Sequence, residues 1–137
     1  MNDRFKFRAW NKLSNEMKDV ISLNINYEFP ECSNVILETN TLDNIKTHNN
    51  PIACANGLNN VVLMQSTGLK DKNGKLIYEG DIVKTSKGIA NVEYDNTYAY
   101  FGLTNFLTVF SFDNFINEEI EVIGNIYENK ELLNENS

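Results

Sequence analysis

The sequence has few of the side chains that carry most enzyme chemistry. It contains one histidine, His48, and two cysteines, Cys32 and Cys54. The cysteines form no CxxC pair, and the spacing of the three residues matches no familiar structural zinc site. No Gly-x-Ser-x-Gly motif and no phosphate-binding loop occurs. We therefore expect no metal, no cofactor and no catalytic residue of these kinds, and cysteines that stay reduced as in the cytoplasm.

Long apolar runs are also lacking. No stretch approaches the length of a membrane span, and residues 1–6 lack the apolar core of a secretion signal. We therefore expect a cytoplasmic protein that does not enter a membrane. With 137 residues, of which 42% are hydrophobic and 11% aromatic, the chain can still bury a core. This composition excludes a disordered chain.

Positive charge is scarce and unevenly placed. Twelve Lys and Arg residues stand against nineteen Asp and Glu, a net charge of −7. Residues 1–18 have a net charge of +3, from five basic and two acidic residues, and residues 117–137 have −5, from one basic and six acidic residues. Because DNA binding draws on clustered positive charge, we expect no strong binding to duplex DNA. The asymmetry is also what two neighbouring strands with facing opposite charges would give.

Glycines divide the most strongly patterned stretch, residues 65–83. Gly68, Gly74 and Gly80 each stand where a strand would turn or begin, and glycine adopts positive φ without steric cost. The sequence Asp-Lys-Asn-Gly at 71–74 predicts a tight turn between two strands. The predicted turn and bend residues are Gly68, Asp71, Gly74, Gly80, Asp81 and Gly124.

Short apolar runs separated by Gly and Asn turns predict a mainly β fold. The expected architecture is a small SH3-like or partly open β-barrel with an N-terminal hairpin and little helix. We expect a single domain over residues 1–137. Its parts are an N-terminal hairpin (1–23), a variable Asn-rich insert (24–60), a β-barrel centre (61–128) and a C-terminal turn and tail (129–137).

Three blocks of sequence resemble a known family. They are TGLKD, NGK and IYEGDIV within residues 67–83, FRAW at 7–10, and EVIGNIYEN at 121–129. Together they resemble the signature of the YopX proteins of bacteriophages and prophages. Ser66 stands where that family usually has an aromatic residue, and Lys130 where it often has proline. The resemblance implies a β-rich phage protein in a bacterial host cell, of unassigned biochemical role, and it supplies no catalytic residues.

Two groups of side chains are candidates for binding. Residues 4–10 alternate strictly, which predicts a half-buried strand with a basic row on its outer face. That row is Arg4, Lys6, Arg8 and Trp10. Such a row can stack on single-stranded nucleic acid or contact a protein, but arginine stems and an indole also commonly cover neighbouring apolar surface.

The second group is aromatic. It comprises Tyr94, Tyr98, Tyr100, Phe101 and Phe106. On one strand Tyr98 and Tyr100 would share a face and Phe101 would take the other, so we expect at least one tyrosine to be exposed. Exposed aromatics grip peptides or stack on bases, whereas buried ones fill a barrel.

Binding is the function that the sequence favours, either to another copy of the chain or to a host or phage protein. One alternative is a small barrel that binds single-stranded nucleic acid. Another is a hydrolase-type enzyme that uses Glu79 and Asp81, which would point the same way on a strand. A turn aspartate bonded to backbone amides, beside a solvated glutamate, is the simpler account of that pair.

Overall fold

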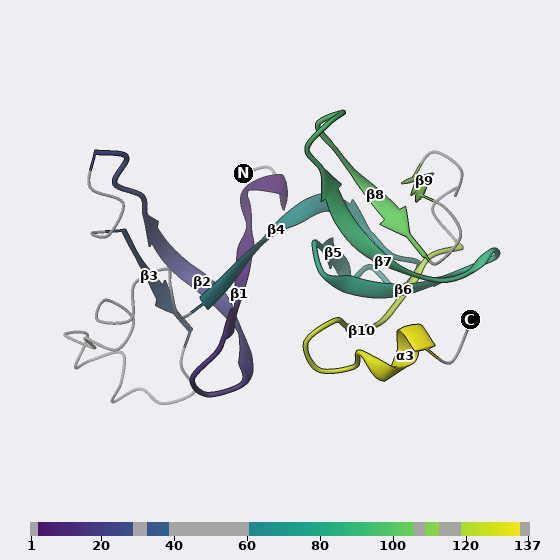
Figure 1. The fold of residues 1–137 in the computed structure, drawn as a ribbon, viewed down its shortest axis with the longest axis horizontal. Coiled ribbons are helices and arrows are strands. Elements are labelled where there is room, and N and C mark those ends of the chain that lie inside the picture. Colours follow the sequence, from purple (N-terminus) through teal and green to yellow (C-terminus); the bar gives the residue numbers. More distant parts are fainter. Residues whose placement is uncertain (1–2, 29–32, 39–60, 106–108, 113–118, 135–137) are drawn as a thin grey trace. The chain divides into compact units, whose positions relative to one another are not determined.

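A computed structural model describes residues 3–28, 33–38, 61–105, 109–112 and 119–134 (Figure 1). The predicted mainly β fold is confirmed. Within the described residues the helical elements are a 3-10 turn, η1 (Asp3–Phe5), and a four-residue helix, α3 (Glu131–Asn134), and Phe112 also has 3-10 conformation. Most of the Asn-rich insert lies outside the described residues, and so do Cys32, His48 and Cys54.

The strands form two antiparallel sheets of five strands each. The first has the order β3-β2-β1-β4-β5 and the second the order β10-β6-β7-β8-β9. The strands of the first sheet are β1 (Phe7–Asn11), β2 (Glu16–Asn24), β3 (Asn34–Leu37), β4 (Val61–Lys70) and β5 (Leu76–Tyr78). Those of the second are β6 (Asp81–Thr85), β7 (Gly88–Asp95), β8 (Tyr100–Thr104), β9 (Val109–Ser111) and β10 (Glu121–Asn125). Neither order of described strands closes on itself, so both sheets are open, and an SH3-like topology stays a prediction.

The chain contacts group into two compact units. The N-terminal unit is residues 6–64. The C-terminal unit consists of two stretches, residues 1–5 and residues 65–137. Strand β4 begins in the first unit and ends in the second, since the division falls between Met64 and Gln65.

The N-terminal unit contains the predicted hairpin, which is confirmed. Strands β1 and β2 pair in antiparallel register, with Ala9 opposite Lys18. The Asn11 side-chain oxygen accepts a hydrogen bond from the Leu13 N–H (2.9 Å), as expected for a polar turn residue. The core of this unit consists of the buried residues Ala9, Val35 and Val61, against which Val20, Leu23 and Leu37 pack.

The C-terminal unit has the larger described core. Its buried members are Ile77, Val83, Ala90, Val92, Leu103 and Ile120, with Phe112 and Val122 packed against them. Along β7 the side chains alternate between the two faces of the sheet, which explains why Ala90 and Val92, two residues apart, are both buried. Full burial of one such valine, leucine or isoleucine side chain stabilises the fold by about 1.5–3 kcal/mol.

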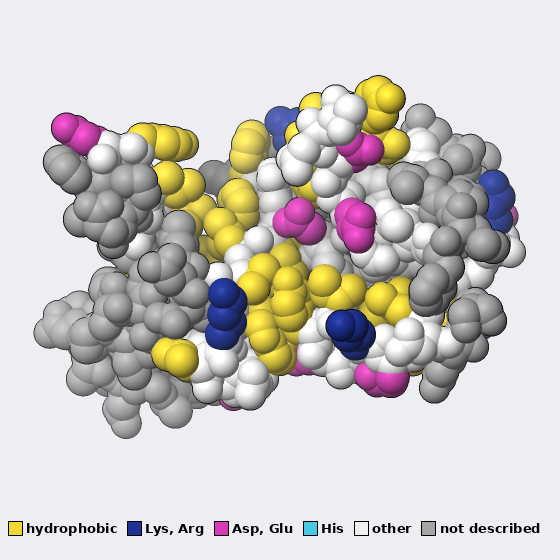
Figure 2. Space-filling model, viewed as in Figure 1, with side chains coloured by type: hydrophobic (Ala, Val, Ile, Leu, Met, Phe, Trp, Pro, Cys, Tyr) yellow, Lys and Arg dark blue, Asp and Glu magenta, His cyan; other side chains and the backbone are white. Residues whose placement is uncertain are grey.

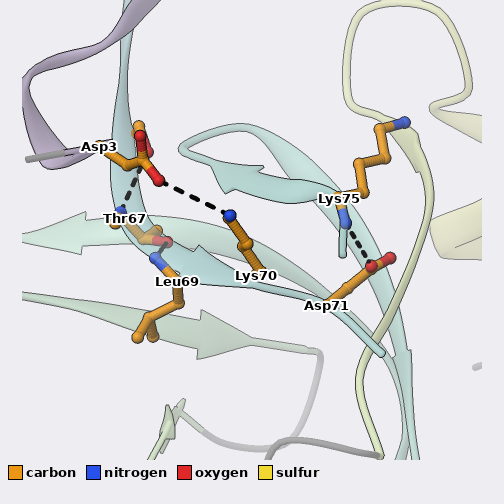
Figure 3. A network of polar contacts seen from close by, with 8 residues as sticks. Asp3, Thr67, Leu69, Lys70, Asp71 and Lys75 are labelled. Atoms are coloured by element: carbon orange, nitrogen blue, oxygen red, sulfur yellow. Dashed lines mark hydrogen bonds and ion pairs between the residues drawn. The ribbon is translucent and has the colours of Figure 1, made fainter. Parts of the chain in front are cut away.

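Asp71 organises the turn between β4 and β5. Its Oδ1 accepts hydrogen bonds from the N–H groups of Asn73 (2.8 Å) and Lys75 (2.9 Å), and its Oδ2 accepts one from the N–H of Val122 (2.9 Å). Figure 3 shows the carboxylate facing Lys75. Burial by itself raises the pKa of Asp71. The three backbone donors and the nearby Lys75 charge outweigh that effect, so the pKa lies below its ordinary value of 3.8.

The turn between β5 and β6 depends on Gly80, whose φ of +86° lies in the left-handed region. The Gly80 N–H donates to the Val92 carbonyl (2.8 Å), and the Gly80 carbonyl accepts from the Ile126 N–H (2.9 Å). Next to it, Asp81 is buried and its Oδ2 accepts from the Tyr78 N–H (2.8 Å). These bonds fix the backbone on both sides of Glu79.

Candidate functional site: an aromatic pocket

An open pocket of about 570 Å³ lies within the C-terminal unit. Its lining comes from separated segments of that unit. Arg4 and Phe5 belong to η1, Gln65 and Thr67 to β4, and Glu79 to the turn after β5. The hairpin of β7 and β8 supplies Tyr94, Ala99, Tyr100 and Phe101. The pocket size falls within the range of small-ligand sites, about 300–1,000 Å³.

Aromatic rings form much of the pocket wall. Tyr94 and Phe101 are partners in the register of β7 and β8, so their side chains share one face of the sheet. Their rings meet edge to face, with centroids 5.1 Å apart and an interplanar angle of 67°. Such pairs add about 0.5–1.5 kcal/mol beyond area burial, so this part of the wall is held in place.

The β7–β8 turn sets the position of Tyr100. The Asp95 Oδ1 accepts hydrogen bonds from the N–H groups of Thr97 (2.7 Å) and Tyr98 (3.1 Å), and the Ala99 N–H donates to the Asp95 carbonyl (2.8 Å). Ala99 has φ +58°, an uncommon conformation for a residue with a Cβ. The chain thereby enters β8 with Tyr100 at the pocket, while Tyr98 stays in the turn and is 74% exposed.

Polar side chains in the lining divide into two kinds. Gln65 and Thr67 support the scaffold. The Gln65 Nε2 donates to the Arg4 carbonyl (2.9 Å) and the Thr67 Oγ1 donates to the Ile77 carbonyl (2.8 Å). Arg4 and Glu79 are the charged groups of the lining. The Arg4 guanidinium lies over the ring of Phe5, 5.1 Å from its centroid.

The short turn η1 is tied to β4 at several points. Besides the bond from Gln65, a Cβ built on Gly68 would lie 3.4 Å from the Arg4 Cβ, so the two segments pass close to each other. Figure 3 shows the Lys70 side chain reaching toward Asp3, with 3.9 Å between the Lys70 Nζ and the carboxylate. These contacts place Arg4 and Phe5 beside the pocket.

The predicted basic row is not one exposed face. Arg4 and Lys6 are exposed, but Arg8 is buried at 8% exposure, and Phe5, expected on the inner face, is 54% exposed. The alternation fails because the strand begins only at Phe7, while residues 3–5 form a 3-10 turn. Of the row Arg4, Lys6, Arg8 and Trp10, only Arg4 belongs to the C-terminal unit.

The predicted aromatic group is only partly brought together. Tyr100 lines the pocket and lies 6.5 Å from Tyr98 between ring centroids, but Tyr98 belongs to the turn and not to the strand. Phe106 lies outside the described residues. Tyr94 and Phe101, which the sequence analysis placed in the aromatic group, both line the pocket. The structure pairs them in the register of β7 and β8, which a turn at 96–99 produces.

Glu79 and Asp81, the carboxylate pair of the enzyme alternative, lie in different environments. Asp81 is 1% exposed and accepts a hydrogen bond from the Tyr78 N–H, an arrangement that stabilises the turn, whereas Glu79 lines the pocket.

Within the described ranges there is no group of three or more His, Cys, Asp or Glu residues able to hold a metal ion. Among the helices of the described residues, none has the length and apolar character needed to cross a membrane.

Figure 2 shows Asp and Glu side chains lying among hydrophobic ones over the second sheet. By sequence, the C-terminal unit has seven basic and thirteen acidic residues, a net charge of −6. The N-terminal unit has five basic and six acidic residues, a net charge of −1. The negative charge of the chain therefore belongs almost entirely to the unit that contains the pocket.

Comparison with known proteins gives a consistent result. The family model described as YopX protein matches residues 6–134. The crystal structure of protein EF1440 from Enterococcus faecalis is 30% identical, with a TM-score of 0.55, covering 93% of this chain and 96% of that one. The crystal structure of protein yopX from Bacillus subtilis is 19% identical, also with a TM-score of 0.55, covering 97% and 99%. No curated protein matches this chain.

Proposed function

This chain belongs to the YopX protein family, and on that premise we propose that it is a phage or prophage accessory protein that acts by binding another protein molecule. The binding surface is the aromatic pocket of the C-terminal unit together with Tyr98 beside it. The partner is either a second copy of the chain or a host or phage protein, and the encounter takes place in the cytoplasm of the bacterial host.

The aromatic pocket is the observation that carries this proposal. Aromatic residues and arginine are enriched at protein interfaces, because they bury a large area at modest entropic cost. Tyr98 at 74% exposure and Phe5 at 54% offer such area at or beside the pocket. The Tyr94–Phe101 ring pair and the Asp95 turn hold the surface in one conformation, which lowers the entropy lost on binding.

The test is an assembly measurement on purified protein. Sedimentation velocity over a range of concentrations reports self-association, and mixing with a partner recovered from a bacterial lysate reports binding to another protein. We expect the combined Tyr98→Ala and Tyr100→Ala variant to weaken either association by roughly tenfold or more, the typical effect of truncating interface anchors.

Tyr27→Ala is the matched control, because Tyr27 is 89% exposed and belongs to the N-terminal unit. Circular dichroism establishes that each variant is folded. If the folded double variant assembles like the parent chain, binding does not use the aromatic pocket and this proposal is wrong.

Binding of single-stranded nucleic acid is a second candidate, favoured by the presence of Arg4 among aromatic rings. The acidic balance of the C-terminal unit opposes it, because phosphates meet repulsion there. Fluorescence anisotropy with a labelled single-stranded oligonucleotide tests it. The hydrolase alternative needs both Glu79 and Asp81, and the buried carboxylate of Asp81 is engaged by the Tyr78 N–H.

A further inference from the structure

We propose that the aromatic pocket receives a cationic side chain of the protein partner, with arginine as the residue that fits it best. This inference rests on the proposed function and names the chemistry that the partner must present. Three properties of the pocket support it: its aromatic rings, its carboxylate, and the charge of the unit around it.

The aromatic rings are the first support. Tyr94, Tyr100 and Phe101 line the pocket, and the negative face of an aromatic ring attracts a cation placed within about 6 Å of its centroid. The chain already makes this interaction once in the pocket lining, where the guanidinium of Arg4 lies 5.1 Å from the Phe5 centroid. A guanidinium from a partner would combine stacking on a ring with hydrogen bonds in its plane.

Glu79 is the second support. Glu79 lines the same pocket as the rings, and its negative charge attracts a cationic side chain that enters. The backbone around it is fixed, since the Glu79 N–H donates to the Gln65 carbonyl (3.0 Å) and Gly80 bonds to Val92 and Ile126. A carboxylate on a rigid turn loses little entropy when it binds a partner.

Overall charge is the third support. The C-terminal unit has a net charge of −6, so an approaching basic segment is attracted and an acidic one is repelled. Arg4 is the opposing feature, because its positive charge belongs to the same lining. Glu79 should therefore raise the affinity for a cationic occupant, and Arg4 should lower it. For an anionic occupant the two effects would be reversed.

This opposition in sign defines the experiment. The probes are a short capped peptide with one arginine and the same peptide with citrulline, which keeps the shape of arginine but has no charge. Aromatic NMR resonances of Tyr94 and Tyr100 in the full-length protein report occupancy of the pocket. We expect the arginine peptide to shift them in a saturable way, and the citrulline peptide to bind about tenfold more weakly.

Three substitutions complete the design. Glu79→Gln should weaken binding of the arginine peptide several-fold, and Arg4→Gln should strengthen it. Glu131→Gln changes the charge of the same unit by the same amount at an exposed position on α3, away from the pocket lining, and should have little effect. The citrulline comparison needs no variant, so the test holds even if a substitution disturbs folding.

Equal binding of the two peptides would overturn the inference. Stronger binding by Glu79→Gln together with weaker binding by Arg4→Gln would also overturn it, because this result indicates an anionic ligand. A single-stranded oligonucleotide that shifts the same resonances while the peptide does not would assign the pocket to nucleic acid. If the arginine peptide fails but the double tyrosine variant still impairs assembly, the proposed function stands with a different occupant. If both fail, the proposed function fails as well.

Discussion

The carboxylate of Asp71 accepts a hydrogen bond from the N–H of Val122, 2.9 Å away and 51 residues later in the chain. A second bond runs beside it, from the Lys72 N–H to the Ile120 carbonyl (2.9 Å). The two bonds join the turn between β4 and β5 to β10 and to the residue before it. Since Ile120 and Val122 belong to the core or pack against it, this link stabilises the C-terminal unit as a whole.

Asp71→Asn should destabilise the protein by about 1–3 kcal/mol, because an amide has one acceptor oxygen and cannot serve donors on both sides of the group. Val122 or the pair Asn73 and Lys75 then loses its acceptor at a partly buried position. Chemical denaturation monitored by circular dichroism measures the effect on the free energy of unfolding.

Asp95→Asn is the control for that substitution. Asp95 also accepts backbone N–H groups in a turn, but only through Oδ1, and the bonds are exposed. Asparagine replaces aspartate well in such turns, so we expect a loss of less than about 0.5 kcal/mol. Equal effects at the two positions would show that the link to Val122 contributes nothing special.

Acid should reveal the lowered pKa of Asp71. Because the folded-state pKa lies below the ordinary value of 3.8, the carboxylate's contribution to stability is complete above pH 3.8. It is lost as the pH falls through the folded-state pKa. The difference in unfolding free energy between the parent chain and Asp71→Asn should therefore shrink as the solution is acidified below pH 3.8. A difference that stays constant through this range would contradict the prediction.

Gly80→Val should destabilise the fold by about 1–3 kcal/mol, because a β-branched residue is strained at φ +86°. Gly74 is the matched comparison. Its φ is +83° and no atom lies within 4 Å of a Cβ built there, so only backbone strain opposes a side chain. Gly74→Asn should be tolerated to within about 1 kcal/mol, since asparagine accepts this conformation. Thermal unfolding of both variants tests the contrast, and a stable Gly80→Val protein would contradict it.

Duplex DNA should bind weakly at most. The chain has a net charge of −7, and the basic residues near the N-terminus are divided between the two units, with Arg8 buried. A fluorescence anisotropy titration at physiological salt should show only salt-sensitive association. Sub-micromolar, sequence-dependent binding would refute this expectation.

Local sequence predicted the mainly β fold class and the turn at 71–74, but Gly68, expected where a strand turns or begins, lies within β4. The Asp-Lys-Asn-Gly segment at 71–74 announces a turn by itself, and it forms one, with Gly74 donating to the Asp71 carbonyl (3.0 Å). The strict alternation from Arg4 to Trp10 misled, because the strand begins only at Phe7 and its neighbouring residues Arg8 and Ala9 are both buried. The Arg4 carbonyl in the 3-10 turn accepts a hydrogen bond from the Gln65 side chain. The pattern of residues 4–10 contains no information about this contact, because Gln65 lies far away in the sequence.

The pocket could not be predicted from local sequence either, because it depends on contacts between segments that are distant in the sequence. Its lining joins η1, β4, the turn at Glu79 and the β7–β8 hairpin, and no period relates these segments. Only the pair Tyr94 and Phe101 follows from a hairpin register, and fixing that register requires the turn at 96–99, where Ala99 rather than glycine adopts positive φ. The long-range Asp71–Val122 bond is likewise invisible in either segment alone.

The discontinuous C-terminal unit has a consequence for the order of events on the ribosome. Gln65 is synthesised 61 residues after its partner Arg4, a delay of roughly 3–12 seconds at about 5–20 residues per second. During that interval the intervening residues, 6–64, are synthesised and can begin to fold. The turn at residues 3–5 cannot yet form its contacts with β4. The aromatic pocket is thus a late product of translation, complete only after the hairpin containing Tyr94 and Phe101 has followed.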